Sequence, residues 1–257
     1  MHICQEQAKH GRATSAGLTL VEVLVVITMT GILSAIMVPA LSTAKEKTRR
    51  VVCKSNEHQV LMVLQEYANE NFDYLPNSAD NKGYYHAIVM SDDTFTNLVT
   101  TAGGNSNIFY CPNIVFGNGP GAVVPHTAAF GYVTGYSYLA GSVSLSTKGP
   151  DTEDNQVKMP FVGTNELIAD ANYWTTSTSV ESSPFPSQMS IAPHTPLGAA
   201  MMRSSSFTVG PPGTTSVTLG AVGGNIGYSD MSVQWRTLPQ LQTNAASSPG
   251  IDSKGLW

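Results

Sequence analysis

The chain has 257 residues, of which 42% are hydrophobic and 12% are charged, and its formal net charge at pH 7 is −5. An acidic balance without a broad basic face argues against nucleic acid as a partner. The 23 glycines and 15 prolines predict many loops and short strands in the parts of the chain that are not helical.

The chain begins with a short basic segment followed by its most apolar stretch. Lys9, His10 and Arg12 precede the apolar run, and positive charge at this place keeps the adjoining end of the chain in the cytoplasm. Residues 18–41 exceed the roughly 20 residues that a helix needs to cross a hydrocarbon core. We therefore expect a leader peptide (1–17), a transmembrane helix (18–41) and a head outside the cytoplasm (42–257). About 215 residues remain for this head, enough for one domain with its own core.

The apolar stretch contains one charged residue, Glu22. A charge placed toward the middle of a bilayer costs about 2.5 to 3.5 kcal/mol on insertion scales, so the carboxylate needs a partner. The nearest cation that the sequence can supply is the α-amino group of Leu18, which would be created by cleavage after Gly17.

These residues resemble the N-terminus of type IV prepilins and type II secretion pseudopilins. The signature of that family is a basic leader ending in Gly, then an apolar residue, Thr, Leu, an aliphatic residue, Glu and an apolar run, which here reads Gly17-Leu18-Thr19-Leu20-Val21-Glu22-Val23-Leu24. The resemblance implies cleavage after Gly17 by a prepilin peptidase, N-methylation of Leu18, and packing of the helix in a filament core. It also implies a helix-bending proline, which Pro39 supplies. A conventional secretory signal, cleaved within residues 39–44, is the alternative reading, but it leaves Glu22 without a role.

The helix is predicted to continue well beyond the membrane. Residues 42–71 contain no Gly or Pro, and their apolar positions Val60, Val63, Leu64 and Ala68 have helical spacing. A helix ending near Asn71 would therefore form the spine of the head. Its basic side chains are expected to form a solvated face; they are Lys45, Lys47, Arg49, Arg50 and Lys54.

The spine also resembles a group of pilin-like proteins abundant in planctomycete and verrucomicrobial bacteria. The shared pattern is a basic pair, Cys, Asn, an amphipathic helix, Tyr and a Leu-Pro stop, supplied here by residues 48–59, Tyr67, Asn71 and Leu75-Pro76.

The same group has a closing motif near the C-terminus, in which a His precedes an Asp-Gly turn. In this chain Gly220 stands at the position of the His and Met231 at the position of the turn Gly. If the His and Asp form a binding pair in that group, this chain has lost half of the pair, and we therefore predict a structural hairpin without metal or ligand.

Beyond residue 76 the pattern predicts short elements. Strands are expected at 84–90, 107–111, 133–139 and 167–171, with a short helix within 91–101 and a loop-rich stretch from 122 to 212. Residues 223–235 have the alternation of a hairpin that turns at Ser229-Asp230. Trp235 is expected to be buried if this hairpin packs on the spine helix.

Sequence motifs for catalysis or cofactor binding are missing. The chain has no Gly-x-Ser-x-Gly elbow, no His-Glu-x-x-His zinc motif and no Cys-x-x-Cys pair. We therefore expect no enzyme activity, no cofactor and no metal site. The oxygens of Asp151, Glu153, Asp154 and Asn155 have a spacing that can hold Ca²⁺, but the full calcium-loop pattern is absent and a solvated acidic loop is favoured. His194 and Asp170 are interpreted as isolated, hydrogen-bonded structural groups.

Two of the three cysteines would remain after cleavage. Cys4 lies in the leader, whereas Cys53 and Cys111 would both belong to a head in an oxidising compartment. They are candidates for a disulfide, which the sequence leaves open because it does not give their separation.

We expect an α+β, pilin-like fold in which a long N-terminal helix packs on an antiparallel β-sheet with long loops. The expected function is that of a pilin or pseudopilin, a single-pass inner-membrane protein with a periplasmic head that assembles into a type IV pilus or a type II secretion pseudopilus. Its partners would be the prepilin peptidase, other subunits and the inner-membrane assembly platform. In the alternative, the helix only anchors a periplasmic binding or enzymatic head. Glu22 favours the filament subunit over the anchored head, since an anchor has no use for a charge in the membrane.

Overall fold

The computed structural model describes residues 19–114, 126–140, 159, 165–175, 189–196, 198–203, 214–246 and 253–257. The chain divides into two compact units, Met1–Ser42 and Thr43–Trp257. Helix α1 (Leu20–Glu70) is continuous through this boundary, as the sequence predicts. The expected processing residues Gly17 and Leu18, the acidic cluster 151–155 and residues 176–184 of the polar loop lie outside the described residues.

The first unit contains the apolar part of α1. Its large apolar side chains are between 42% and 82% exposed, and the mean hydropathy of the most apolar window is 2.3, with none of that window buried. In the part of the chain that the structure describes, α1 is the one helix that is long and apolar enough to cross a membrane, by length and composition. Pro39 lies inside the helix without ending it.

In the second unit one side of α1 is buried. The buried residues recur every three or four positions; they are Glu46, Cys53, Glu57, Val60, Leu61, Val63, Leu64 and Ala68. Four of the five basic side chains are exposed as predicted, namely Lys45, Lys47, Arg49 and Lys54. Arg50 differs, because it is half-buried and its Nε donates to Glu46 Oε1 at 3.1 Å.

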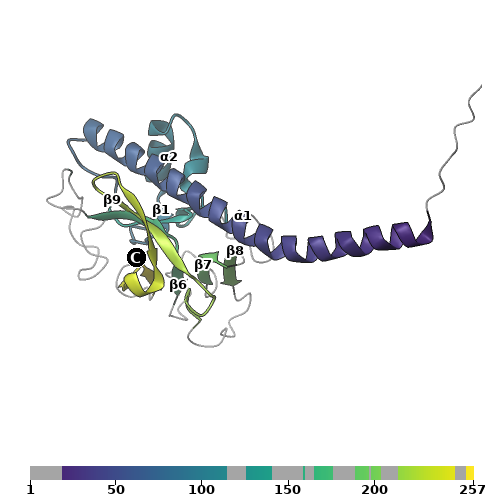
Figure 1. Ribbon diagram of the computed structural model, residues 1–257. Coiled ribbons are helices and arrows are strands. Elements are labelled where there is room, and N and C mark those ends of the chain that lie inside the picture. Colours follow the sequence, from purple (N-terminus) through teal and green to yellow (C-terminus); the bar gives the residue numbers. More distant parts are fainter. Residues whose placement is uncertain are drawn as a thin grey trace, which may run out of the picture. The chain divides into compact units, whose positions relative to one another are not determined.

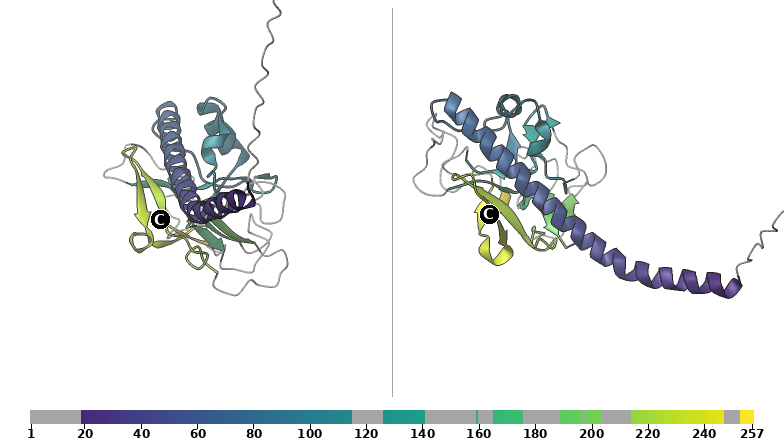
Figure 2. Two further views of the ribbon diagram at one scale, coloured as in Figure 1. Left: turned by 45° about the vertical axis from the view of Figure 1, so that its right-hand side comes forward. Right: turned by 45° about the horizontal axis from the view of Figure 1, so that its top comes forward.

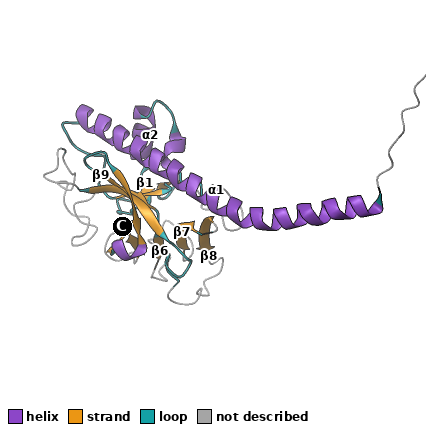
Figure 3. Cartoon of the chain, viewed as in Figure 1, coloured by secondary structure: helices purple, strands orange, loops and turns teal. Residues whose placement is uncertain are grey.

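Within the described residues the strands form three sheets, and every pairing there is antiparallel. A four-stranded sheet has the order β10-β9-β5-β4, made of Val233–Thr237, Gly223–Tyr228, Glu166–Asp170 and Tyr136–Tyr138. A five-stranded sheet has the order β11-β12-β6-β7-β8, made of Thr243–Ala245, Ser253–Leu256, Tyr173–Thr175, Met189–Thr195 and Gly198–Arg203. A small sheet has the order β1-β3-β2, made of Val89–Met90, Gly131–Val133 and His126–Thr127. The fold is therefore α+β with a long N-terminal helix, but with three short-stranded sheets rather than the single sheet expected (Figure 3).

The shorter elements agree with the sequence only in part. The predicted helix within 91–101 is α2 (Asp92–Thr101), whose cap Ser91 accepts a hydrogen bond from the Thr94 N–H. The strand predicted at 107–111 is wrong, because this segment forms a 3₁₀ helix (Ser106–Phe109) started by the Asn105 side chain. The loop-rich interpretation of 122–212 missed the hairpin of β7 and β8, and a second 3₁₀ helix (Leu238–Gln240) follows β10.

The second part of α1 lies across the four-stranded sheet, as Figures 1 and 2 show from three directions. The helix and the sheet are in close contact at Gly227 of β9. A Cβ atom there would lie 2.6 Å from Ile168 Cγ2 and 2.9 Å from Leu61 Cδ1. Glycine is required because the helix and the neighbouring strand together leave no room for a side chain.

Gly227→Ala should therefore lower the free energy of unfolding by about 1 to 3 kcal/mol through overpacking. Chemical unfolding of the full chain in detergent, followed by circular dichroism, measures the loss. The double variant Gly227→Ala/Leu61→Ala should lose less unfolding free energy than the sum of the two single losses, because one of the side chains that would clash with the new methyl group is gone. Strict additivity would contradict this account of the contact.

The predicted C-terminal hairpin is confirmed. β9 and β10 pair from Val233↔Gly227 to Thr237↔Gly223, and Asp230 Oδ1 accepts the Ser232 N–H at 2.9 Å within the turn. Met231 has a φ of 66°, a left-handed conformation that glycine adopts at lower cost. Trp235 is half-buried rather than buried, and the Arg50 guanidinium of α1 lies 4.5 Å from the centroid of its ring.

Trp235→Ala should cost about 1 to 3 kcal/mol of unfolding free energy, below the 3 to 5 kcal/mol of a fully buried aromatic residue. Trp235→Phe, which keeps an aromatic ring beside Arg50, should lose less. Denaturant titration monitored by far-ultraviolet circular dichroism separates these values. An unchanged midpoint for Trp235→Ala would show that the hairpin does not depend on its contact with the spine helix.

Candidate functional site

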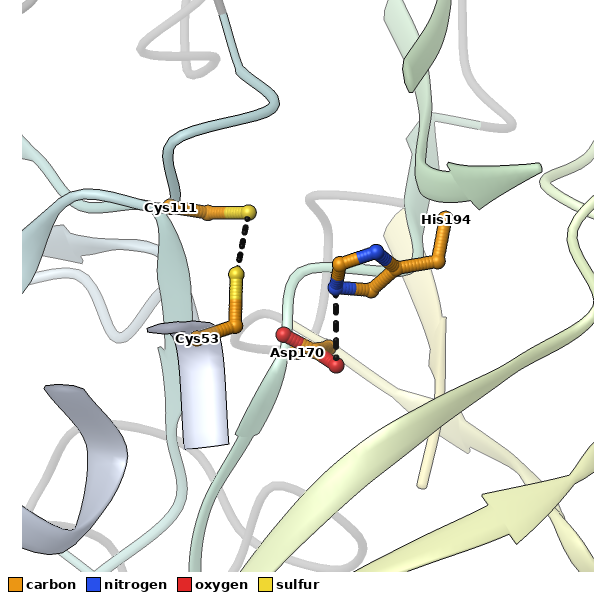
Figure 4. Close-up of side chains that lie close together, drawn as sticks. All are labelled: Cys53, Cys111, Asp170 and His194. Atoms are coloured by element: carbon orange, nitrogen blue, oxygen red, sulfur yellow. Dashed lines mark hydrogen bonds and ion pairs between the residues drawn. The ribbon is translucent and has the colours of Figure 1, made fainter. Parts of the chain in front are cut away.

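Four buried side chains from separate elements meet in the second unit. They are Cys53 of α1, Cys111 after the first 3₁₀ helix, Asp170 at the end of β5 and His194 of β7 (Figure 4). One sulfur, nitrogen or oxygen atom from each lies within 4.8 Å of the others. None of the four is more than 1% exposed. We call these four residues the buried cluster.

The spine helix supplies one member of the cluster and two neighbouring carboxylates. Glu46, Cys53 and Glu57 are separated by seven and four residues, so they lie on the same side of α1, and all three are buried. Neither oxygen of Glu57 has a hydrogen-bond partner of good geometry among the described residues, and the Glu57 side chain interacts with Asp170. This side of the helix is thus partly acidic in a region where burial normally selects apolar side chains.

Cys111 is placed by close backbone contacts. A Cβ at Gly135 would lie 2.2 Å from the Cys111 backbone nitrogen, and the Gly135 N–H donates to the Phe109 carbonyl at 2.8 Å. The Asn56 side chain of α1 donates to the Tyr110 carbonyl at 3.3 Å. These contacts bring Cys111 Sγ to 2.9 Å from Cys53 Sγ, so the two sulfurs face each other.

Asp170 is held by the neighbouring strand β9. Its Oδ2 accepts the backbone N–H of Asn225 at 2.6 Å and the Asn225 side-chain amide at 3.0 Å. Its Oδ1 is buried and has no hydrogen-bond partner among the described residues. One oxygen therefore fixes the carboxylate to the sheet, while the other is left free for a further contact.

His194 lies where the pairing of β7 with β8 shifts register between Ala192 and Thr195. Such bulges redirect side chains, and here the ring is directed toward α1. Its Nδ1 lies 2.8 Å from Glu46 Oε1. Because Asn113 Nδ2 donates to Glu46 Oε2 at 2.9 Å and to the Pro193 carbonyl at 2.8 Å, both amide hydrogens are used and His194 Nδ1 is assigned as the donor to Glu46.

The other ring nitrogen of His194 has a poorer contact. Nε2 lies 3.4 Å from Asp170 Oδ2, which is beyond the usual hydrogen-bond distance, and this oxygen already accepts two hydrogen bonds from Asn225. Nε2 has no hydrogen-bond partner of good geometry among the described residues. The ring is thus held on its Glu46 side and weakly paired on the side that faces the cluster.

Mutual interactions shift the pKa values of these groups. Burial has the largest single effect on His194 and opposes its protonation, but the interactions of the ring with Asp170 and Cys111 together outweigh burial and raise the pKa of the imidazole to about 11. Burial would raise the pKa of Cys111, but its interactions with the neighbouring Cys53 and His194 lower it to about 7. The pKa of Cys53 is raised by its hydrogen bond to Cys111 and by burial. Burial raises the pKa of Glu57 well above its usual range.

A thiol beside an imidazole is also the pair found in cysteine nucleophiles. A surface hollow of about 650 Å³ lies between α1 and residues 105–114, and Cys111 is one of its lining residues. The thiol is nevertheless only 1% exposed, and its sulfur faces Cys53. A substrate would have no access to the sulfur, so the arrangement suits a structural role better than nucleophilic attack.

The structure brings together residues that the sequence treated separately. The proposed disulfide candidates Cys53 and Cys111 are adjacent, and their bonding stays a prediction. His194 and Asp170 were interpreted as isolated, and they lie side by side instead. Glu46 and Glu57 were missed, although their seven- and four-residue spacing from Cys53 on the apolar side of the spine is a signal for buried carboxylates.

Of the residues expected at the N-terminus, Glu22 is described. Its Oε2 accepts hydrogen bonds from the backbone N–H and the hydroxyl of Thr19, both at 2.8 Å, and the Glu22 N–H donates to the Thr19 hydroxyl at 3.3 Å. This is a capping box, in which side chains satisfy the free N–H groups at the start of a helix.

Comparison with family models, with curated proteins and with solved structures found no match to this chain.

The Glu46 contacts generate a prediction. Glu46→Ala removes the partner of His194, Arg50 and Asn113 and leaves a buried charge without compensation, so unfolding should become easier by about 3 kcal/mol. Glu66→Ala, an exposed carboxylate on the same helix, is the matched control and should change stability by no more than about 0.5 kcal/mol. Denaturant titrations of both full-length variants give the comparison, and equal losses would contradict the role given to Glu46.

Proposed function

We propose that the chain is a structural filament subunit of the prepilin or pseudopilin type. In this proposal a prepilin peptidase cleaves after Gly17, the new amino group of Leu18 is methylated, and the apolar part of α1 leaves the inner membrane to pack among neighbouring subunits. Lys9 and Arg12 keep the leader in the cytoplasm, which places the second unit in the periplasm. Other subunits and the inner-membrane assembly platform are the partners.

The observation that carries the proposal is the position of Glu22 in α1. It is the single charged residue between Leu18 and Leu41, and the apolar side chains around it are exposed along the whole segment. Both a bilayer and a bundle of identical helices would cover these side chains. Only the bundle also supplies a cation at a fixed position along the helix axis, namely the N-terminal amine of an adjacent subunit.

The capping box offers a competing explanation for Glu22. Its carboxylate accepts two hydrogen bonds from Thr19, and a carboxylate in the first turn also favours the helix through its dipole. A cap explains the side-chain geometry, but it would be provided equally well by an uncharged acceptor. The proposal therefore depends on the charge, and this difference can be measured.

Glu22→Gln and Glu22→Ala separate the two explanations. Glutamine retains an acceptor for Thr19 but loses the charge, whereas alanine loses both. We expect both variants to insert and to be cleaved normally, and both to reduce filament yield by about tenfold or more, because a cation buried in the filament would lose its partner. Processing is read from the mass of the chain and assembly from sheared filaments.

Normal filaments from Glu22→Gln would overturn the charge-pairing role and leave only the cap. Gly17→Val is the control for processing, and it should leave the leader attached, visible as an unshifted mass. Absence of filaments from the wild-type chain in cells that carry an assembly platform would favour the alternative, in which α1 only anchors a periplasmic head.

A further inference from the structure

We propose that the buried cluster is a structural zinc site whose ligands are the Sγ atoms of Cys53 and Cys111, Nε2 of His194 and one carboxylate oxygen of Asp170. The inference does not depend on the filament function. It concerns the second unit alone, and all four ligands belong to described residues.

The donor set suits zinc. Structural zinc sites are four-coordinate and tetrahedral, and they are built from thiolate, imidazole and carboxylate ligands. Soft thiolates select against Mg²⁺ and Ca²⁺, which prefer an all-oxygen shell. Four protein ligands leave no open position, and the complete burial of the cluster likewise excludes solvent and substrate.

The unsatisfied atoms of the site are the second, independent observation. His194 Nε2 and Asp170 Oδ1 are buried and have no hydrogen-bond partner among the described residues, although buried polar atoms are nearly always paired. Both belong to the cluster in which the two sulfurs also meet. A cation among them would satisfy both atoms at once.

Glu46 provides the support that zinc-bound histidines usually have. A histidine that binds metal through one nitrogen commonly donates from the other to a carboxylate, which fixes the tautomer and the orientation of the ring. His194 Nδ1 lies 2.8 Å from Glu46 Oε1, and Asn113 holds the other oxygen of that carboxylate at 2.9 Å. Nε2 is consequently the nitrogen that faces the cluster.

The distances require a small adjustment. Tetrahedral geometry with Zn–S bonds of about 2.3 Å places two sulfurs about 3.8 Å apart, compared with 2.9 Å here. The cluster atoms lie within 4.8 Å of one another and would have to approach by up to about 1 Å. The imidazole and the carboxylate are already close, with Nε2 at 3.4 Å from Asp170 Oδ2. Rotation of the cysteine side chains can supply such shifts. On binding, the two thiols and any protonated His194 release their protons to solvent.

The site would join α1 to both large sheets. Cys53 is on the spine helix, Asp170 is in the four-stranded sheet and His194 is in the five-stranded sheet, while Cys111 fixes the segment that leads toward the small sheet. A structural metal at such a junction stabilises the folded chain because the unfolded chain cannot preorganise the ligands.

Metal content tests the proposal. The full chain carrying Cys4→Ser, which leaves Cys53 and Cys111 as its two cysteines, is purified in detergent and analysed for metals. We expect about one zinc per chain, lost in Cys53→Ser and in Asp170→Asn. His126→Ala, which changes an exposed histidine paired with Asp92, is the matched control and should retain the zinc.

Cobalt supplies a second readout, which is taken first on the chain with all four ligands intact. Co²⁺ added to the reduced, zinc-depleted Cys4→Ser chain should give the visible bands of tetrahedral cobalt and a near-ultraviolet thiolate charge-transfer band. Both features should be absent from Cys53→Ser, because a site that has lost one thiolate and no longer holds zinc binds cobalt more weakly still. Zinc should displace the cobalt and abolish both features.

A disulfide is the competing state, because bonded sulfurs cannot bind zinc as thiolates. Cells are quenched in acid, and the Cys4→Ser chain is unfolded without reductant, treated with chelator and labelled at free thiols. Two labelled thiols per chain are expected. No labelled thiols, or a reduced chain that takes up neither zinc nor cobalt, would overturn the proposal.

Discussion

The second unit depends on the contact between one side of α1 and the sheets that surround it. This side is apolar toward its C-terminal end, where Leu61 approaches Gly227 and Ile168. Toward its N-terminal end it carries Glu46, Cys53 and Glu57 instead. A charged carboxylate is costly to bury without partners, and Glu46 has three in His194, Arg50 and Asn113. The polar end of the contact therefore sets a specific position for the helix that apolar packing alone would not define.

The same contact explains why distant strands carry unusual residues. His194 reaches α1 from a bulge in β7, and Asp170 is fixed by two hydrogen bonds from Asn225 on β9. Gly135 allows the backbone of Cys111 to come close to β4. Each feature is locally unfavourable or neutral, and each becomes favourable only because it delivers a polar atom to the cluster. A zinc ion would complete this arrangement by pairing the atoms that the protein leaves unsatisfied.

The two units pose opposite physical problems. In the second unit polar groups are buried and must find partners within the chain. In the first unit apolar side chains are exposed, and their partners must come from outside the chain, from lipid or from other helices. Glu22 is the exception within the first unit. The proposed filament function rests on this residue, whereas the proposed zinc site rests on the second unit, so either can fail without the other.

The sequence by itself determined the long helix, because apolar spacing and the absence of Gly and Pro between residues 42 and 71 are local properties of the chain. It also determined α2 and the C-terminal hairpin, whose cap and turn residues act within a few positions. Only the tertiary structure decided that Asp170 and His194 meet Cys53 and Cys111. The sequence separations among these residues range from 24 between Asp170 and His194 to 141 between Cys53 and His194, and no local pattern encodes which strand passes which turn of the helix. The tertiary structure likewise decided that Trp235 is half-buried, since its exposure depends on what packs against it.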